Sequence, residues 1–540
     1  MILQLGVDAD QSLLQQDAWD LCIVGGGAAG LALATQFLGS SWRVLVLESG
    51  LHSPDAFADD LNTVESIGLP HDGWRQGRVR SFGGTTRAWG GQLVPMRRSE
   101  LEARPWIPDS GWPLDLDTLQ PYYRRVEALL RVEGPPYDET TWGRLGLAAP
   151  HLDPEKLCVR FSQWAALGRR NFALLWRKDL QRSQNVTVVL DATTVAVKCT
   201  AQGAHCEAVE VRSRSGLHSR VRATRFVIAC GGIETARLLL ASNPGPGPGT
   251  SPGPGTAVAN SSGLVGRYFQ DHISYIAGEL QPVSRRAVQH LFDPRYIRST
   301  MFSVKLEPTD AAMRANGWLN AMAHLAFQIP DALGWMELRR LLRSVQAGRL
   351  ELPSLHESFE MLRSGGQLLR LVLARALAKR RRSPDSGGIL LLVDTEQAPN
   401  ADSRVVLDSS VDRLGMPRVR LDWRLTGLEQ QTLTGFAQTV AAQFERLGLG
   451  TVRLAGPPDP TQRDCLGAAR DIFHHMGTTR MSQCPRSGVT CPDLRCHDVD
   501  NLFIAGPSVF PAGGIANPTF TALALTLRLA DHLKSVAVPS

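Results

Sequence analysis

The sequence lacks any apolar run of the roughly 18 residues that a membrane-spanning helix requires, so we expect no transmembrane segment. Its nine cysteines show no C-x-x-C spacing, which excludes a c-type haem site, and their odd number does not indicate a disulfide framework. Residues 1–14 lack a basic segment and include Asp8 and Asp10, so we expect no secretory signal peptide. We therefore predict reduced thiols and a cytoplasmic location.

A strong excess of charge of either sign is also missing. The net charge of +6 over 540 residues is too small to indicate nucleic-acid binding. A composition of 43% hydrophobic and 20% charged residues is typical of a globular protein, and the length predicts more than one ordinary core. Cys484, Cys491, Cys496 and His497 lie close in sequence, but they lack the closely spaced ligand pairs of zinc sites, so no metal is predicted.

The N-terminal segment carries a glycine-rich turn between two expected strands. Residues 20–24 and 44–47 are short apolar runs of strand type, and residues 31–38 between them favour a helix. The turn that joins the first strand to this helix reads Gly-Gly-Gly-Ala-Ala-Gly and occupies residues 25–30. This strand–turn–helix–strand order is the setting in which the pattern G-x-G-x-x-G binds a dinucleotide.

The residues of this turn have separate physical roles. Gly25 permits the tight bend, Gly27 lets the backbone approach a pyrophosphate, and Gly30 lets the helix pack closely on the strand. Ala29 lies in the same turn, and Glu48 follows the second strand, where its carboxylate can accept hydrogen bonds from a ribose diol. These five residues predict a bound dinucleotide, but they do not distinguish a nicotinamide from a flavin.

Two motifs near the C-terminus indicate the chemistry. His474 lies in F-H-H-M-G-T-T-R-M, and Asn517 lies in the later motif G-G-I-A-N-P-T. Asn517 is a favourable N-cap and Pro518 suits a first turn, so we expect a helix that begins there and runs through residues 521–533. A histidine that accepts a proton, an amide that orients an oxygen and a helix N-terminus that stabilises negative charge together suit the oxidation of an alcohol.

Four segments together resemble one flavoprotein family. Residues 20–50, 78–96, 225–243 and 472–533 are similar to the glucose–methanol–choline (GMC) oxidoreductases, and most similar to the branch of pyranose oxidases and sugar or sugar-acid dehydrogenases. The paired motifs H-x-x-G-T and G-G-x-x-N-P-T are the most specific part of this resemblance. It implies FAD as the cofactor and an α/β fold: a Rossmann-like FAD-binding domain built from discontinuous segments, plus an α+β substrate domain with an antiparallel sheet.

The resemblance also implies how the chain is divided. We expect the FAD-binding domain over residues 1–273, with the loop 78–96 along the flavin, and the substrate-binding domain over residues 274–453. Residues 454–540 would return to the FAD-binding domain and carry the catalytic pair. A helical insertion is expected over residues 331–383. Its basic residues can contact a membrane or a partner, but a cap over the substrate pocket is the favoured interpretation. Alternating or apolar runs predict strands at 186–190, 226–230, 301–306, 321–329, 389–395, 404–407 and 419–423.

Further cofactor contacts follow from the family motifs. In the family, the loop that reads S-F-G-G-T-T-R-A-W-G-G here holds the pyrophosphate and the isoalloxazine edge, and the backbone near Val195 meets adenine. In pyranose oxidases a histidine bonded covalently to the flavin precedes the loop tryptophan, whereas this chain has Ala88, so non-covalent FAD is predicted. The additional cofactor-binding residues that the resemblance implies are Gly84, Thr85, Trp89, Gly90, Val195, Gly506, Pro518 and Thr519.

The resemblance assigns the catalytic roles to two residues. His474 would take the hydroxyl proton as hydride leaves carbon for the flavin N5, and Asn517 would orient the same oxygen. The helix that begins at Pro518 would stabilise the negative charge of the reduced flavin. His475 is the rival base. The segment with Asp271 and His272 is expected near the cofactor, in a catalytic or a packing role.

The substrate class and the electron acceptor are predicted only in outline. We expect a small-molecule alcohol, polyhydroxylated as a sugar or polyol is, because the resemblance is to the sugar-oxidising branch. Oxygen, a quinone and a carrier protein remain open as acceptors. The alternative function is a non-redox FAD-containing lyase of the same fold, similar to hydroxynitrile lyases or the fatty-acid photodecarboxylase.

Overall fold

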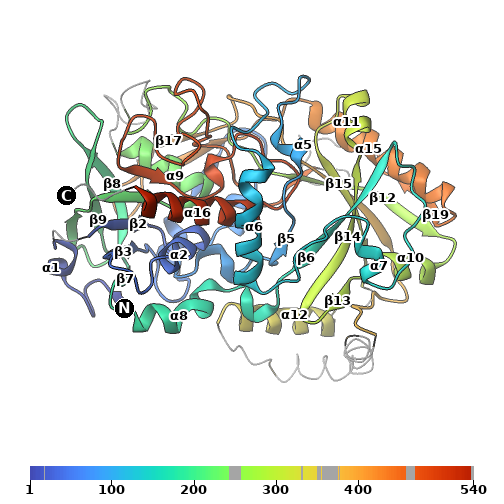
Figure 1. Ribbon diagram of the computed structural model, residues 1–540, viewed down its shortest axis with the longest axis horizontal. Helices are drawn as coiled ribbons and strands as arrows, with labels where there is room; N and C mark the ends of the chain where they lie inside the picture. The colour runs from blue at the N-terminus through green and yellow to red at the C-terminus, as the bar shows by residue number, and fades with distance from the viewer. Residues whose placement is uncertain are drawn as a thin grey trace.

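The computed structural model describes residues 1–16, 19–242, 257–329, 333–348, 354, 375, 378–457 and 469–536. The proline- and glycine-rich stretch 244–255 and most of the expected insertion 331–383 lie outside these residues. Two lobes lie side by side along the long axis, one with a parallel sheet and one with a large antiparallel sheet (Figure 1). The mixed α/β fold with antiparallel sheets that the sequence predicted is therefore confirmed.

A six-stranded parallel sheet forms the core of the first lobe. Its strand order is β1-β7-β3-β2-β11-β21, and every neighbouring pair is parallel. Five of the six strands are buried along their whole length, as expected for a parallel sheet covered on both faces. The bounds are Ile2–Gln4 for β1, Leu21–Val24 for β2, Val44–Leu47 for β3, Val186–Leu190 for β7, Arg225–Ile228 for β11 and Leu502–Ile504 for β21.

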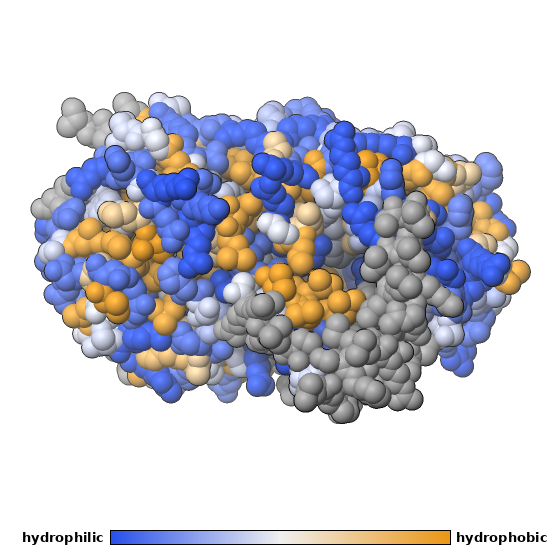
Figure 2. Space-filling model, turned by 90° about the horizontal axis from the view of Figure 1, so that it is seen from below, coloured by the Kyte–Doolittle hydropathy of each residue, from blue (hydrophilic) through white to orange (hydrophobic). Residues whose placement is uncertain are grey.

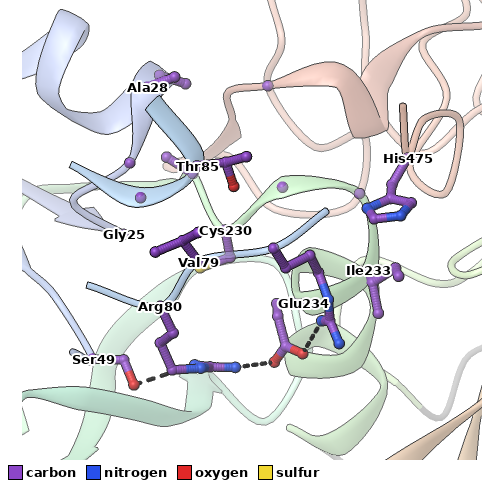
Figure 3. Close-up of a pocket in the computed structure, with 18 of the residues that line it drawn as sticks. Gly25, Ala28, Ser49, Val79, Arg80, Thr85, Cys230, Ile233, Glu234 and His475 are labelled. Atoms are coloured by element: carbon purple, nitrogen blue, oxygen red, sulfur yellow. Dashed lines mark hydrogen bonds and ion pairs between the residues drawn. The ribbon is translucent and has the colours of Figure 1, made fainter. Parts of the chain in front are cut away.

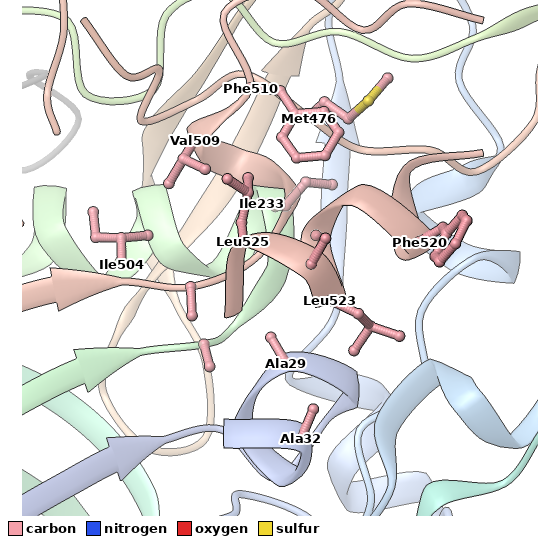
Figure 4. Packing of buried hydrophobic residues seen from close by; sticks show 14 of the residues in the cluster. Ala29, Ala32, Ile233, Met476, Ile504, Val509, Phe510, Phe520, Leu523 and Leu525 are labelled. Carbon is pink, nitrogen blue, oxygen red and sulfur yellow. The ribbon is translucent and has the colours of Figure 1, made fainter. Parts of the chain in front are cut away.

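Three helices cover the region where the first and last parts of the chain meet this sheet. They are α2 (Ala28–Thr35), α9 (Gly231–Ala241) and α16 (Pro518–Ser535). The residues of α2 are small or apolar and mostly buried, so α16 can lie directly against it. Leu523 of α16 lies above Ala29 and Ala32 of α2 in this packing (Figure 4). The C-terminal helix thereby joins the N-terminal turn in one core.

The predicted helix over 31–38 begins earlier in the structure. Helix α2 starts at Ala28 because Gly27 is already its N-cap. Gly30 therefore lies inside the helix, where an added Cβ would come 1.8 Å from the Gly25 carbonyl oxygen. Only glycine allows this first turn to pack against the chain that enters it.

A nine-stranded antiparallel sheet forms the second lobe. Its strand order is β19-β12-β16-β15-β14-β6-β5, with β13 paired to β14 and β20 paired to β12. The strands at 301–306, 321–329 and 389–395 were predicted and are present, with β16 matching its predicted bounds. The bounds are Gln92–Leu93 for β5, Leu157–Trp164 for β6, Ile273–Pro282 for β12, Arg295–Ile297 for β13, Thr300–Pro308 for β14, Ala321–Phe327 for β15, Ile389–Thr395 for β16, Gly450–Leu454 for β19 and Arg470–Asp471 for β20.

The strands of this sheet come from distant parts of the chain. Strands β5 and β6 precede residue 273, and β20 follows residue 453, so the sheet draws on all three of the segments expected from the sequence. The division at 273 and 453 stays a prediction. Helix α15 (Leu428–Arg446) covers one face and contacts β12, β15 and β16. The other face carries alternate residues that include polar side chains, described below.

Two smaller sheets complete the first lobe. One contains β17 (Arg404–Val411), β18 (Pro417–Asp422) and β4 (Val64–Ser66), and it lies against α9. The other follows β7 and contains β8 (Thr193–Cys199), β9 (Cys206–Arg212) and β10 (His218–Val221). The remaining helices are α1 (Gln11–Leu14), α3 (Ala56–Asp60), α4 (Gly73–Gln76), α5 (Arg98–Leu101), α6 (Leu116–Leu130), α7 (Thr141–Arg144), α8 (Phe172–Arg182), α10 (Arg285–Phe292), α11 (Asp310–Asn316) and α12 (Leu333–Gln346), with short 3₁₀ turns at Gly84–Arg87, Leu167–Arg169 and Pro507–Val509.

Helix α12 is the described helix of the predicted insertion. Gln346 donates to the Trp89 carbonyl at 2.8 Å, and Asn171 donates to the Gln346 carbonyl at 2.8 Å. These bonds tie its end to the glycine-rich loop, which favours the capping role. The face seen from below has a compact apolar patch near its centre (Figure 2). Helix α12 itself carries two exposed apolar side chains, Leu342 and Val345. Among the described helices, none combines the length and apolarity needed to cross a bilayer.

Candidate active site

The main pocket lies at the carboxyl ends of the parallel strands. Val24, Leu47, Ala229 and Ala505, which end or follow β2, β3, β11 and β21, all line it. The space free of protein atoms measures about 1520 Å³, with open solvent at its mouth included. This edge is where open parallel sheets bind their ligands. The sequence-predicted residues that line the pocket are Gly25, Gly27, Ala29, Glu48, Gly84, Thr85, His474, Gly506, Pro518 and Thr519.

Four of the predicted cofactor-binding residues and Asn517 do not line this pocket. Gly30 lies beneath the turn and sets its packing. Trp89 donates from its indole to the Arg170 carbonyl at 2.7 Å, and Gly90 lies against Trp164. Val195 is buried, but its neighbours Thr193 and Thr194 line the pocket. The contacts of Asn517 are with the neighbouring His474.

Two helix N-termini meet at the pocket without side-chain caps. Gly27 and Asn517 are the N-cap residues of α2 and α16, and neither makes a side-chain capping bond. Ala28 and Ala29 of the first helix and Pro518 and Thr519 of the second line the pocket. Uncapped N-termini carry free donors and partial positive charge, which suits negatively charged groups of a ligand.

Glu48 is the buried carboxylate of the pocket. Gly26 and Gly50 donate their backbone N–H groups to it, each at 2.8 Å. Burial raises the pKa of Glu48, while these two bonds and Arg80 act in the opposite direction. Each oxygen still has a lone pair for a further donor, as the predicted ribose contact requires.

A network of arginines around Glu234 was missed from the sequence. Glu234 accepts from Arg78 at 2.7 Å, pairs with Arg80 at 2.9 Å and with Arg237 at 3.2 Å. Arg80 also donates to Ser49 at 3.2 Å, so the chain of contacts crosses the pocket floor (Figure 3). Despite burial, the three arginines hold the pKa of Glu234 far below its usual range. The signal available in the sequence was the Arg-x-Arg pair just before the glycine-rich loop.

His474 and Asn517 are brought together across 43 residues. The Asn517 Nδ2 atom lies 3.4 Å from the His474 Nε2 atom. Burial and the neighbouring His272 lower the pKa of His474 to about 4, against the opposite effects of Asp271 and Asp394. The imidazole is therefore neutral at neutral pH and able to accept a proton.

His272 fixes which nitrogen of His474 is free. The His272 Nε2 atom lies 2.7 Å from the Gly514 carbonyl oxygen, which can only accept, so this nitrogen carries a hydrogen. The other nitrogen of a neutral His272 then accepts from His474 Nδ1–H across 2.8 Å. His474 Nε2 is left without a hydrogen, beside Asn517. The Gly514 carbonyl thus sets the tautomer of the candidate base through one intervening ring.

Asp271 holds the segment that carries this histidine. Its carboxylate accepts the backbone N–H of His474 at 2.8 Å and bonds His71 Nε2 at 3.1 Å. Hydrogen bonding to His71 and the neighbouring histidines outweigh burial and lower the pKa of Asp271 to about 2. Potential ligand atoms of His71, Asp271 and His475 lie within 4.8 Å of one another, and we interpret them as this hydrogen-bonded cluster. Among the described residues, Cys484, Cys491, Cys496 and His497 do not bring three potential ligand atoms this close together.

His475, the rival base, also lines the pocket (Figure 3), but its ring contacts other residues than that of His474 does. Its ring stacks on Phe269 with centroids 5.9 Å apart, and its Nε2 atom lies 3.9 Å from the Asp271 carboxylate. Burial lowers the pKa of His475 to about 3. The two adjacent histidines therefore differ in surroundings: His474 meets Asn517, and His475 joins the Asp271 cluster.

Comparison with known proteins agrees with this geometry. The family model for GMC oxidoreductase matches residues 399–526, a stretch that contains both His474 and Asn517. The chain is 26% identical to 6'''-hydroxyparomomycin C oxidase of Streptomyces lividus over 95% of this chain and 92% of that protein. Residues 399–526 therefore form a GMC oxidoreductase C-terminal domain. The chain is also 25% identical to paromamine 6'-oxidase of Streptomyces fradiae, over 95% of this chain and 90% of that protein.

A solved structure extends the agreement to the fold. The chain is similar in fold to pyridoxine 4-oxidase from Mesorbium loti, with a TM-score of 0.56 and 17% identity over 96% of this chain and 100% of that chain. Members of the family depend on FAD, and the pocket residues fit that cofactor. The buried Thr194 hydroxyl lining the pocket has no partner among the described residues, and Glu48 and the two uncapped helices supply the expected acceptor and donors.

Proposed function

We propose that this GMC oxidoreductase oxidises the CH–OH group of a sugar, a polyol or another alcohol to a carbonyl, with His474 as the general base. The observation that carries the proposal is the His474 Nε2 atom, which has no hydrogen in the tautomer set by His272 and lies 3.4 Å from Asn517. FAD, when bound, supplies the acceptor for the hydride that leaves the carbinol carbon. The relatives described above are named as oxidases of 6'''-hydroxyparomomycin C and of paromamine.

The two side chains act on the same substrate oxygen. His474 Nε2 accepts the hydroxyl proton, and the pKa of about 4 keeps this nitrogen free of a proton at neutral pH. Asn517 donates from Nδ2 to that oxygen and holds the carbinol in one orientation. Asn517 makes no capping bond to α16, and beside the contact with His474 its Nδ2 atom has a second hydrogen for this bond. The backbone N–H groups at the start of α16 stabilise negative charge in the pocket.

The proposal includes FAD that is held without a covalent bond. Ala88, which stands before the loop tryptophan, has no atom that could form such a bond. Cys230 lines the pocket, but burial raises the pKa of its thiol to about 12, so it is not a thiolate at neutral pH. The cofactor would then depend on the backbone donors of α2, on Glu48 and on the loop at Gly84 and Thr85.

The first test is anaerobic. Purified holoprotein is mixed with sugars, polyols, aminoglycosides and simple alcohols, and the blue absorption of the flavin is recorded. We expect bleaching by one class of alcohol, and admission of oxygen or addition of a quinone or carrier protein then identifies the electron acceptor. Protein whose flavin is reduced by dithionite but by no alcohol would contradict the proposal and favour a non-redox lyase.

A further inference from the structure

One face of the antiparallel sheet is polar yet withdrawn from solvent. The β14–β15 register pairs Leu306 with Ala323, which sets Lys305 opposite His324 on this face. The β15–β16 register pairs Met322 with Asp394 and His324 with Leu392, so Asp394 stands diagonally from His324 on the same face. The side chains of His324 and Asp394 are 26% and 11% exposed, and Lys305 is 7% exposed.

Two polar atoms of this cluster have no hydrogen-bond partner among the described residues. Within the described residues, the His324 Nδ1 and Asp394 Oδ1 atoms are buried without a hydrogen bond. The His324 Nδ1 atom lies 3.6 Å from Asp394 Oδ2, which is too far for a good hydrogen bond. Burial lowers the pKa of the Lys305 ammonium. Burying such groups unpaired costs free energy, so the fold retains them for a ligand that satisfies them.

This face extends from the flavin loop to the candidate base. At one end, Trp164 of β6 lies against Gly90 and donates to Ser303 at 2.9 Å. At the other end, Asp394 is close enough to His474 to raise its pKa against the effect of burial. Lys305 and His324 lie between these ends and next to Asp394, which places the three side chains where the part of a substrate that does not react would lie.

Among the described residues, the charged side chains of β6, β14 and β16 balance one another. Arg160, opposite Lys305, pairs with Glu100 at 2.9 Å and with Glu307 at 3.1 Å, and Arg97 also pairs with Glu307 at 3.5 Å. These two arginines and two glutamates cancel. Lys305 and Asp394 contribute one charge of each sign, and burial and Lys305 keep His324 neutral by lowering its pKa to about 4. A ligand with a net charge would disturb this balance.

We propose that Lys305, His324 and Asp394 form the subsite that binds the hydroxyl groups of a neutral polyhydroxylated ring, at carbons other than the one oxidised. This inference rests on the proposed oxidation of an alcohol and names its substrate class. Asp394 accepts from ring hydroxyls, Lys305 donates to them, and the neutral His324 offers one donor and one acceptor. A hydroxyl between His324 and Asp394 satisfies both orphaned atoms at once.

The test uses three sugars that differ in charge: D-glucose, D-glucosamine and D-glucuronate. Rates and affinities of anaerobic flavin reduction are measured with the FAD-loaded enzyme and with Asp394→Asn and Lys305→Met. We expect the wild-type enzyme to prefer glucose. Asp394→Asn should weaken glucose binding about 10- to 100-fold, mainly through KM, and shift the preference toward glucuronate because Lys305 is left unbalanced. Lys305→Met should shift it toward glucosamine.

Lys198→Met is the matched control, since Lys198 lies on β8, away from this face, and is 39% exposed. The inference is overturned if a charged sugar is preferred by the wild-type enzyme, if both variants change all three sugars equally, or if the control behaves as they do. It is also overturned if simple alcohols bleach the flavin and none of the three sugars does, in which case alcohol oxidation itself stands. Failure of every alcohol would instead contradict the proposed function. Bound FAD and Tm verify that each variant folds, and the wild-type preference tests the inference without any variant.

Discussion

The Nδ1 atoms of His272 and His474 lie 2.8 Å apart, although 202 residues separate the two histidines in the chain. Two ring nitrogens at this distance share one hydrogen, and the Gly514 carbonyl decides on which ring it is found. The bond thus ties the strand that begins at Ile273 to the catalytic motif and prepares His474 to accept a proton at Nε2. Three predictions follow from this pair, and two follow from the cofactor pocket.

Replacing His474 by alanine should remove the base and leave the pocket intact. We expect His474→Ala to retain FAD and to lower the rate of flavin reduction by about 10²- to 10⁴-fold, the usual contribution of a general base. Stopped-flow absorbance with the best alcohol of the panel measures this rate. His475→Ala is the contrasting variant, because His475 contacts the Asp271 cluster rather than Asn517. If His475→Ala loses the rate and His474→Ala keeps it, the assignment is wrong.

On acidification, the rate of flavin reduction should decline only at an unusually low pH. This decline is the acid limb of the pH profile. His474 acts when neutral, and its pKa of about 4 lies below the ordinary value of 6.5. The rate should therefore stay high as pH falls below 6.5 and decline only as pH falls through about 4. Rates of reduction in anaerobic buffers across this range provide the measurement. A limb near 6.5 would show that His474 is more hydrated than the structure indicates.

His272 is a positioning residue whose removal should act on both rate and pH profile. In His272→Phe the Nδ1–H of His474 loses its acceptor, so the tautomer with Nε2 free is no longer favoured and the rate should fall. The pKa of His474 should rise, since a protonated ring at residue 272 would repel a protonated His474 and phenylalanine cannot, and the acid limb should move to higher pH. His272→Asn offers an oxygen acceptor and should restore part of the rate. A slower enzyme with an unmoved limb would indicate a packing role alone.

Gly30 and Gly27 form a matched pair within one turn. An added Cβ at Gly30 would lie 1.8 Å from the Gly25 carbonyl oxygen, whereas one at Gly27 would meet no protein atom within 4 Å. Gly30→Ala should therefore lower the free energy of unfolding by about 1–3 kcal/mol, as overpacking does. Gly27→Ala should leave the stability of the apoprotein unchanged but weaken FAD binding. Thermal unfolding with and without added FAD separates the two effects, and equal loss of stability would contradict the packing argument.

Acid precipitation tests how the cofactor is held. We expect intact FAD in the supernatant after the holoprotein is denatured, because Ala88 cannot form a covalent bond to it and the Cys230 thiol is protonated. The absorbance of supernatant and pellet is compared. Yellow colour that stays with the denatured chain would show a covalent link from another side chain.

Much of the first lobe could be predicted from the sequence because its signals are local. The strands β2 and β3, the glycine turn and the helix at Pro518 each depend on residues within a short window. Helix α2 began earlier than predicted because Gly27, rather than a residue after the turn, is its N-cap. The motif around Asn517 gave the helix start correctly, but its side chain contacts His474 and makes no capping bond.

By itself the sequence determined the glycine turn after β2, the helix start at Pro518 and the antiparallel strands of the second lobe, since glycine, proline and alternating apolar residues act on their own neighbourhood. It also predicted the roles of His474 and Asn517. Only the tertiary structure decided that His272 faces His474, that Arg80 and Glu234 cross the pocket floor, and that Lys305, His324 and Asp394 share one sheet face. Such contacts depend on which strands become neighbours and in which register, and that choice is made by the packing of the whole core.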